Sequence, residues 1–300
     1  MRFISLGAVF FVAISFPIGA LAMSVVSPFL PIALRFTVIA VLLWCGLLLQ
    51  HLACPQRALL PRGVQWWWAV TAGILVQGVQ ILAAYWAIAH GVSPGMCALV
   101  IAMNPVATAG LARLLGGRSE NRWGYLALAA GVVGVVSACL PMVLSDPRLG
   151  PGLLAVLLAL AGLAVGSFLQ SRHLTGVTPA AFTAIGTTAS IPPAIILALT
   201  EPEHVSDVRE ALTLLVVLVV TSALGTVFYA ACVQRSGARQ ASALFAVIPA
   251  VAAVGSWALL GTDLGVSTLI GLAFGALACL AQVKAARFTA AQVAIVTSRT

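Results

Sequence analysis

Several polar and aromatic side chains lie within long apolar stretches of the sequence, where they could bind a small solute. Gln77 and Gln80 are three residues apart and therefore share one face of a helix, and Tyr85 and Trp86 follow about two turns after Gln77. Amides and aromatic rings in such places can bind a polar or zwitterionic solute, or they can bond to neighbouring helices. The other predicted solute-binding residues are Ser15, Phe16, Asn104, Gln170, Thr226, Tyr229 and Trp257.

Arg35 lies several residues into an apolar stretch, within the segment Pro31–Phe36 (PIALRF). No aspartate or glutamate lies in the interior of any apolar stretch to pair with it, since Glu210 stands at the very start of its stretch. Its guanidinium could hold a carboxylate or phosphate of a substrate. Alternatively, it could extend to the nearest aqueous surface or bond helix-end carbonyl groups as a structural clamp. Because Arg35 lies only about two turns into its stretch, we favour the structural role.

Prolines inside three of the predicted helices suggest hinges. A proline removes one backbone hydrogen bond and bends a helix, so Pro17, Pro105 and Pro249 are predicted to flex beside the solute. Pro105 and Pro249 are the stronger pair because they recur at matching places. Prolines are nevertheless also common in membrane helices that have no such role.

Groups suited to catalysis or metal binding are scattered. The four histidines are far apart in sequence, and no two carboxylates pair within an apolar stretch. Five of the six cysteines lie inside apolar stretches, and none belongs to a CxxC motif. We therefore expect no catalytic residue, no metal, no cofactor and no enzymatic activity.

The composition indicates what surrounds these residues. The chain has 300 residues, of which 62% are hydrophobic and only 7% are charged, whereas soluble domains contain about 25% charged residues. So few charges cannot cover a surface that faces water. The net charge is +8, but the basic residues are scattered rather than clustered as a nucleic-acid-binding face requires. The sequence predicts an all-α polytopic membrane protein that contacts a lipid bilayer and no nucleic acid.

Ten apolar runs approach the roughly 20 residues that a membrane-spanning helix needs. Lipid offers no hydrogen bonds to an open backbone, and segments such as Leu212–Val220 lack the alternation of a β-barrel, so each run is predicted to be a helix. The first run resembles a signal peptide, but we take it as a retained span. The runs are approximately 4–23, 28–49, 66–89, 94–115, 123–144, 149–171, 177–200, 210–234, 238–260 and 264–285.

The loops between the runs sort by charge. When they are assigned alternately to two sides, one side receives 12 of the 15 basic residues, and only Arg148 and Arg209 fall on the other. Because cytoplasmic loops are enriched in lysine and arginine, the pattern predicts ten spans with both termini in the cytoplasm. The basic residues on the predicted cytoplasmic side are Arg2, Arg57, Arg62, Arg113, Arg118, Arg122, Arg172, Arg235, Arg239, Lys284, Arg287 and Arg299.

A repeated spacing divides the chain into two halves. Tyr85 precedes Pro105 by 20 residues, Tyr229 precedes Pro249 by 20, and a glycine follows each proline by 26. Each half holds five runs, and an odd number inserts the second half upside down. Inverted repeats are typical of transporters, with the binding site between them near the membrane midplane. The predicted units are a first repeat at 1–146, a second at 147–290 and a cytoplasmic tail at 291–300.

These motifs resemble the EamA-type members of the drug/metabolite transporter superfamily. The resemblance rests on the PIALRF segment, on AYWAIAHGVSPGMCALVIAMNPVATAGLARLLGG in the third and fourth runs, on the glycine-rich fifth run, and on SGARQASALFAVIPAVAAVGSWALLGT in the second half. It covers nearly the whole chain as two five-helix units. The chain departs from the family in its second half, which has no counterpart of Arg35, and in the place of the acids after each Leu-Gly pair.

The resemblance implies a transporter of the bacterial inner membrane that exports amino acids or related small metabolites by alternating access. Runs 1, 3, 4, 6, 8 and 9 would line its cavity. Drugs, nucleotide sugars or vitamins are alternative substrates, and an accessory membrane protein without transport activity is a further alternative. The expected partners are the small-molecule substrate and the lipid bilayer, and the protein is expected to be a monomer or a homodimer.

Overall fold

The chain folds into helices throughout its described residues. The computed structural model describes residues 2–53, 60–116, 122–145, 150–200, 207–243, 247–261, 265–266, 269–281 and 284, without the side chains of 2–5, 116, 138–145, 227 and 229–243. The helices are α1 (Arg2–Val25), α2 (Leu30–Ala53), α3 (Gln65–Gly73), the π-helix η1 (Ile74–Val79), α4 (Gln80–Ala89), α5 (Pro94–Ile101), α6 (Asn104–Gly116), α7 (Arg122–Ser145), α8 (Gly150–His173), α9 (Pro179–Thr200), α10 (Val208–Ala243), α11 (Ile248–Leu260) and a last helix at Leu269–Ala281.

Seven helical segments of the described chain are long and apolar enough to cross a membrane. They correspond to predicted runs 1 to 4 and 6 to 8. The fifth, ninth and tenth runs coincide with shorter apolar helices at Arg122–Ser137, Ile248–Leu260 and Leu269–Ala281. The all-helical, multi-pass fold is therefore confirmed, whereas the count of ten spans and the inverted orientation of the halves stay predictions.

Large apolar side chains cover the outer surface of the helices. Leu114 is 82% exposed, Leu199 is 77% exposed and Trp67 is 76% exposed. Water would be a poor solvent for such a surface, and the hydrocarbon of a bilayer is the medium that suits it. The packing inside the bundle therefore depends on close fit between helices more than on removal of apolar surface from water.

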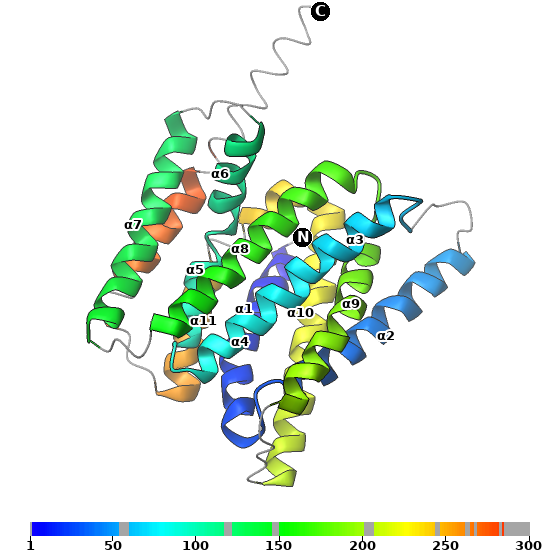
Figure 1. The fold of residues 1–300 in the computed structure, drawn as a ribbon, viewed down its shortest axis with the longest axis horizontal. Helices are drawn as coiled ribbons and strands as arrows, with labels where there is room; N and C mark the ends of the chain where they lie inside the picture. Colours follow the sequence, from blue (N-terminus) through cyan, green and yellow to red (C-terminus); the bar gives the residue numbers. More distant parts are fainter. Residues whose placement is uncertain are drawn as a thin grey trace, which may run out of the picture.

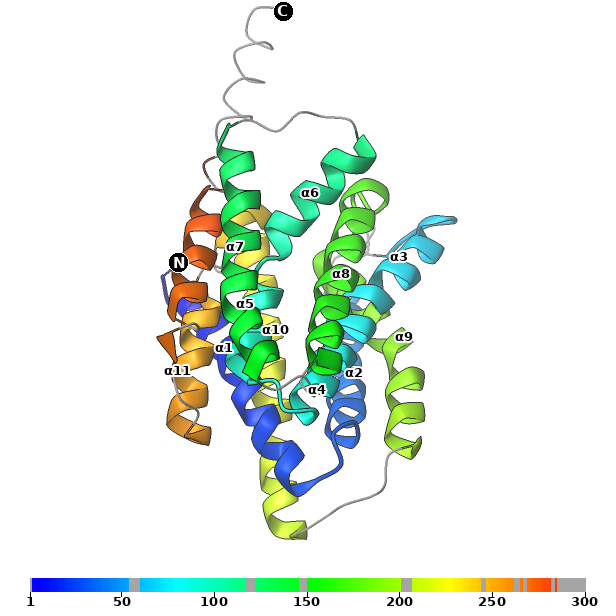
Figure 2. The same ribbon diagram turned by 60° about the vertical axis from the view of Figure 1, so that its left-hand side comes forward.

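Two edge pairs of helices flank a central group (Figures 1 and 2). α1 packs against α10, α11 and α5, while the rod formed by α3, η1 and α4 packs against α8 and α9. α2 lies along α9 at one edge, and α7 lies beside the last helix at the opposite edge, as Figure 1 shows. The helices between the edge pairs are those of runs 1, 3, 4, 6, 8 and 9.

The predicted hinge prolines occupy two kinds of position. Pro17 lies inside the continuous helix α1, as predicted. Pro105 lies in the first turn of α6, just after the break at 102–103 inside the candidate span Pro94–Leu115, and Pro249 lies in the first turn of α11. A proline is well suited to a first turn, because the N–H that it lacks would have no helical partner there. Their action as hinges stays a prediction.

α10 extends beyond its predicted boundary. The eighth run was predicted to end at 234 and the ninth to begin at 238, whereas α10 is one helix from Val208 to Ala243. The predicted loop at this point is therefore wrong. Gly237 alone does not end the helix, because an interior glycine costs only about 1 kcal/mol and no proline follows it within α10.

Glycines mark the closest helix crossings. A Cβ atom at Gly73 of α3 would collide with the backbone of Gly186 in α9. A Cβ atom at Gly166 of α8 would lie 2.6 Å from a methyl carbon of Val76 and 2.9 Å from the carbonyl oxygen of Ala72. Without side chains at these points the backbones come close together, as is common between membrane helices. These crossings hold α3 and η1 between α8 and α9.

Candidate functional site

Hydrogen bonds join three helices of the first half at what we call the Arg35 cluster: Arg35, Tyr85 and Ser15. Nη1 of Arg35 on α2 donates to the hydroxyl oxygen of Tyr85 on α4 at 3.4 Å. The Tyr85 hydroxyl in turn donates to the backbone carbonyl of Ser15 on α1 at 3.3 Å. Arg35 thus reaches a helix carbonyl through a tyrosine, and whether it acts as a structural clamp stays a prediction.

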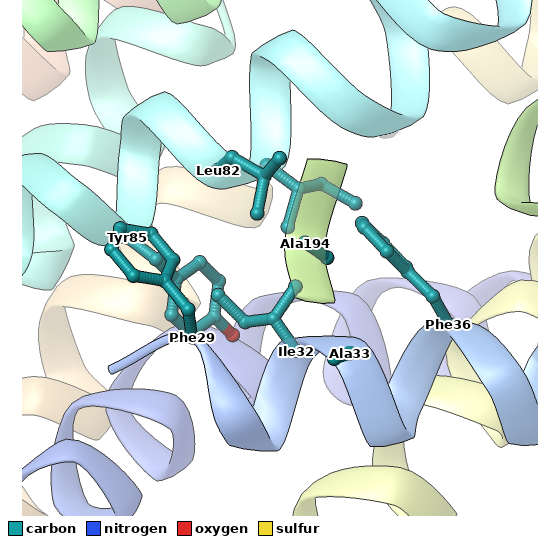
Figure 3. Packing of buried hydrophobic residues seen from close by; sticks show 8 residues of the cluster. Phe29, Ile32, Ala33, Phe36, Leu82, Tyr85 and Ala194 are labelled. Atoms are coloured by element: carbon teal, nitrogen blue, oxygen red, sulfur yellow. The ribbon is translucent and has the colours of Figure 1, made fainter. Parts of the chain in front are cut away.

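The surrounding packing holds the Tyr85 ring in place. Tyr85 is 3% exposed and packs with Phe29 and Ile32 near the start of α2 and with Leu82 on its own helix (Figure 3). Gly19 of α1 faces the ring from the other side, and a Cβ atom there would collide with the phenol. Tyr85 is thus enclosed between α1 and α2 with its hydroxyl beside Arg35.

Arg35 carries a positive charge that nothing in the described residues balances. Its Nε atom is buried without a hydrogen-bond partner. The described acids, Asp207 and Glu210, are exposed at the start of α10 and form no ion pair with it. A guanidinium stays protonated, and a central arginine costs about 2.5–3.5 kcal/mol on insertion scales. The 3.4 Å contact with a neutral hydroxyl is longer than the roughly 2.7–2.9 Å of a charge-assisted bond, so it offsets little of this cost.

The two predicted amides lie at a local change in helix geometry. Gln77 lies within η1, and Gln80 begins α4, where its N–H donates to the carbonyl of Leu75, five residues back. Both side chains are partly buried, and the described residues offer their amides no hydrogen-bond partner. Single π-turns inside α-helices are frequent at functional sites. The two amides therefore remain available to a solute.

Aromatic residues lie on two sides of the Arg35 cluster. Phe16 of α1 packs against two clusters of buried residues, one that includes Ala84 of α4 and one that includes Ala98 of α5. Trp86 packs beside Tyr85, and its ring stacks on His90 with 3.6 Å between centroids. Phe16 and Trp86 are the chain neighbours of Ser15 and Tyr85, and their role in binding a solute stays a prediction.

Asn104 lies where the fourth run is interrupted. α5 ends at Ile101, the chain turns at 102–103, and α6 begins at Asn104. The Asn104 side-chain oxygen accepts a hydrogen bond from the Thr108 hydroxyl at 3.0 Å. The amide nitrogen has no partner in the described part of the chain, so it can still donate to a solute.

The remaining predicted solute-binding residues are not joined to the Arg35 cluster by any hydrogen bond or ring contact among described side chains. Gln170 is partly buried in the last turn of α8. The Thr226 hydroxyl donates to the Ser222 carbonyl of its own helix at 2.9 Å, and Trp257 on α11 is 57% exposed. The side chain of Tyr229 lies outside the described residues. The roles of these four residues stay predictions.

The described residues contain no group of three or more histidine, cysteine, aspartate or glutamate side chains that could hold a metal ion. His90 and His173 each stack on a tryptophan instead, with 3.6 Å to Trp86 and 4.0 Å to Trp68 between ring centroids. The polar chemistry of the described interior therefore consists of one guanidinium, one phenol, amides, hydroxyls and backbone carbonyls.

Sequence reasoning missed three parts of this site. Gly19 had no recognised role, although a glycine two residues after Pro17 is a signal for close approach by another group. Ser15 was selected for its hydroxyl, but that hydroxyl donates to Val12 of the same helix at 2.7 Å, and the carbonyl makes the useful contact. The pairing of Arg35 with Tyr85, 50 residues away, has no signal in a single sequence.

Similarity to known proteins agrees with this fold. A solved crystal structure of another protein superposes with a TM-score of 0.64; it is 17% identical, and the match covers 95% of this chain and 97% of that chain. Identity this low shows the fold alone. No match was found among curated protein sequences. Residues 150–283, most of the predicted second repeat, match the model of the EamA-like transporter family. The chain is therefore similar to the EamA-like transporter family over residues 150–283.

Proposed function

We propose that the protein is a bacterial inner-membrane transporter that exports small metabolites, amino acids or closely related compounds, by alternating access. The match of residues 150–283 to the EamA-like transporter family carries the proposal. Seven segments that can cross a membrane and an interior with unpaired polar groups support it. The substrate class and the outward direction come from the resemblance and from the chemistry of the interior.

The packing pattern supports two equivalent five-helix halves. In the proposed repeat, α1 corresponds to α8, α2 to α9, the α3–η1–α4 rod to α10, and α5–α6 to α11. The contacts of α1 with α10 and α11 are then matched by those of α8 with the rod and with α5–α6. The contact of α2 with α10 matches that of α9 with the rod. The α2–α9 and α5–α11 contacts each join two helices that correspond to each other, so exchanging the halves leaves these contacts unchanged. A two-fold axis that exchanges the halves produces such a pattern.

Alternating access requires helices that can change their packing around a fixed site. The interruption at 102–103 and the π-turn of η1 lie in the fourth and third runs, beside the central helix α8. Both leave short helical pieces that can tilt without unfolding a whole span. The proposed binding site lies among these pieces and α1, where Gln77, Gln80, Asn104 and the Arg35 cluster are found.

The chemistry of the interior favours a polar solute over a lipophilic cation. A cation would be attracted by a buried carboxylate, and the described helices contain no acid away from the exposed start of α10. Amides, a phenol and a guanidinium suit a solute that carries both acceptors and donors. Drugs, nucleotide sugars and vitamins remain the competing substrates to be included in a transport assay.

Flux in proteoliposomes tests the proposal. The purified full-length chain is reconstituted, the vesicles are loaded with radiolabelled amino acids, and efflux is compared with that from protein-free vesicles. Efflux of at least one amino acid above the protein-free rate is expected. If efflux equalled the protein-free rate for every amino acid, nucleotide sugar, vitamin and drug tested, the transport proposal would be wrong. The accessory role without transport activity would then be the remaining explanation.

Reporter fusions test the proposed orientation. A reporter that is active only in the cytoplasm is fused after Thr300, and another that is active only outside the cytoplasm is fused at the same place. Cytoplasmic activity is expected, because the basic loops place both termini inside. A carboxyl terminus outside the cytoplasm would contradict the prediction of ten spans. It would not bear on the transport proposal, which the flux assay tests separately.

A further inference from the structure

We propose that Arg35 binds the carboxylate of the transported solute, and that the Tyr85 hydroxyl is the partner that this carboxylate replaces. The inference rests on the proposed transport function and makes it more specific. It changes the main role of Arg35 from a structural clamp to a contact that exchanges between a tyrosine and a substrate. The expected ligand class is a small carboxylate, with α-amino acids as the first members to test.

The first observation is the unbalanced charge. Arg35 has no ion pair in the described residues, and its Nε atom is buried without a hydrogen-bond partner. A buried donor without a partner is uncommon in native proteins and calls for an explanation such as an absent ligand. A bound carboxylate supplies both the missing acceptor and the missing negative charge.

The second observation is the length of the contacts. The Arg35–Tyr85 distance is 3.4 Å and the Tyr85–Ser15 distance is 3.3 Å, both beyond the usual ranges of roughly 2.7–3.2 Å for N–H donors and 2.5–3.0 Å for O–H donors. A rigid clamp would be expected to use short bonds. These long bonds hold the Tyr85 hydroxyl in a place that a stronger acceptor can take over.

The third observation is the shape of the guanidinium. Arginine offers N–H groups in a planar fork that matches the two oxygens of a carboxylate, and such bidentate pairs are the strong form of this interaction. An acceptor that bonds Nε and a neighbouring Nη satisfies the buried orphan donor, which the Tyr85 hydroxyl on Nη1 does not reach. The Nε edge of Arg35, which is buried without an acceptor, therefore suits a carboxylate better than a neutral group.

The position of the cluster connects binding to the helices around it. Arg35, Tyr85 and Ser15 belong to α2, α4 and α1, so a carboxylate that replaces the Tyr85 contact loosens the link between α2 and the other two helices. Tyr85 itself stays enclosed by Gly19 and the α2 side chains. Binding then weakens the hydrogen bonds that link three helices of the first half.

The test uses the full-length protein in a neutral detergent. Thermal unfolding is measured with each of the twenty proteinogenic L-amino acids and with the carboxamide of every amino acid that stabilises the protein. We expect the carboxamide to bind about 100-fold more weakly than the acid, a difference of about 2.7 kcal/mol. In Arg35→Gln the preference for the acid should fall to about threefold or less, and Arg35→Lys should retain part of it.

Two variants guard against a simple folding defect. Arg62→Gln is the matched control, because Arg62 is exposed and only its backbone is seen to bond another residue; it should keep the wild-type preference. Tyr85→Phe removes the competing hydroxyl and should leave the preference for the acid intact or increase it, even if Arg35→Gln does not fold. An equal loss of acid and amide binding in Tyr85→Phe would support the clamp and overturn the proposal.

The outcomes separate this proposal from the proposed function. Efflux of solutes with no preference between acid and amide would overturn the role of Arg35 and leave transport standing. Binding of an amino acid with the acid preference but no efflux would support Arg35 and contradict transport. No stabilisation by any of the twenty amino acids would overturn the proposal. The proposal would also be overturned if Arg35→Gln changed the unfolding temperature only when anionic phospholipid is added. That result would identify a lipid phosphate as the ligand of Arg35.

Discussion

The α3–η1–α4 rod and α10 occupy corresponding places in the two proposed halves, yet they are built differently. The rod contains a π-turn, two free amides and the buried Tyr85, whereas α10 runs without interruption for 36 residues. Aligned on Tyr85 and Tyr229, Gln77 and Gln80 correspond to Thr221 and Leu224. The Thr221 hydroxyl donates to its own helix at Val217, 2.6 Å away. The proposed repeat would thus preserve the packing of a helix without preserving its chemistry.

If the proposed site is right, the first half supplies most of the side chains that face the solute, and the second half mostly supplies a surface for packing. The Arg35 cluster also lies wholly in the first half. Two equivalent halves need not share the binding work equally, because the two-fold axis constrains the backbone and not the side chains. Variants at corresponding positions can test this division.

The largest expected effect is on folding, at the glycine crossing of the rod. Gly73→Ala places a methyl group against the backbone of Gly186, which cannot move aside as a side chain can, so we expect a loss of about 3 kcal/mol in the free energy of unfolding. Gly225→Ala in α10 should cost less, because the nearest atoms to its Cβ lie at 3.2 Å. The measurement is the amount of monodisperse protein and its unfolding midpoint in detergent.

Gly46→Ala is the control for these two variants, because nothing lies within 4 Å of a Cβ atom at Gly46 in α2. It should be neutral or slightly stabilising, since alanine is the better helix former. If Gly73→Ala were as well folded as Gly46→Ala, the close contact between α3 and α9 would be wrong.

The next effect is on transport. Gln77→Ala removes an amide that no described residue binds, and we expect efflux to fall about tenfold, the loss of one good hydrogen bond to the solute. Thr221→Ala, its counterpart in α10, should change efflux by less than about twofold, because its hydroxyl already bonds its own helix. Initial efflux rates at matched protein content check both values. Equal losses in the two variants would show that both halves contact the solute.

A smaller effect concerns the stability of the Arg35 cluster. Tyr85→Phe removes the two long hydrogen bonds and should lower the free energy of unfolding by about 1.5 kcal/mol. The measurement is the midpoint of unfolding without any ligand, with Tyr229→Phe as the counterpart in the second half. A larger loss in Tyr229→Phe would place the stronger buried polar contact in α10 and reverse the comparison.

The smallest effect is at the end of the rod. The Ser93 side chain accepts a hydrogen bond from the N–H of Met96 at 3.3 Å and caps α5, whereas α10 continues past the corresponding region without a cap. Ser93→Ala should cost about 1 kcal/mol. Thermal unfolding would reveal it, and no change would mean that water caps α5 equally well.

Much of the fold followed from the sequence because the bilayer imposes simple rules. Backbone groups in lipid must bond within a helix, so apolar runs such as 66–89 and 149–171 predicted helices that the structure shows at nearly the same bounds. The end of α10 could not be predicted in the same way. Arg235 and Gly237 suggested a loop, but neither residue type forbids a helix.

The candidate site was predicted in part. Ser15 and Tyr85 were selected as polar groups inside spans, and hydrogen bonds connect both of them with Arg35. The π-turn could not be foreseen, because the groups packed around it are distant in sequence: Gly73 and Gly78 face α9, and Gly166 of α8 faces Val76. The partner of Arg35 was hidden for the same reason.

The π-turn of η1 places one more residue in the third span than a regular α-helix would. Were those six residues to tighten into an α-helix, all that follows would advance by one position, a screw motion of about 100° and 1.5 Å. Tyr85 would then leave the pocket that Gly19 provides, and Arg35 would lose the only neighbour that now engages it among the described side chains. A shift of one residue in the backbone hydrogen bonds of η1 would thus change a side-chain contact about three helical turns away.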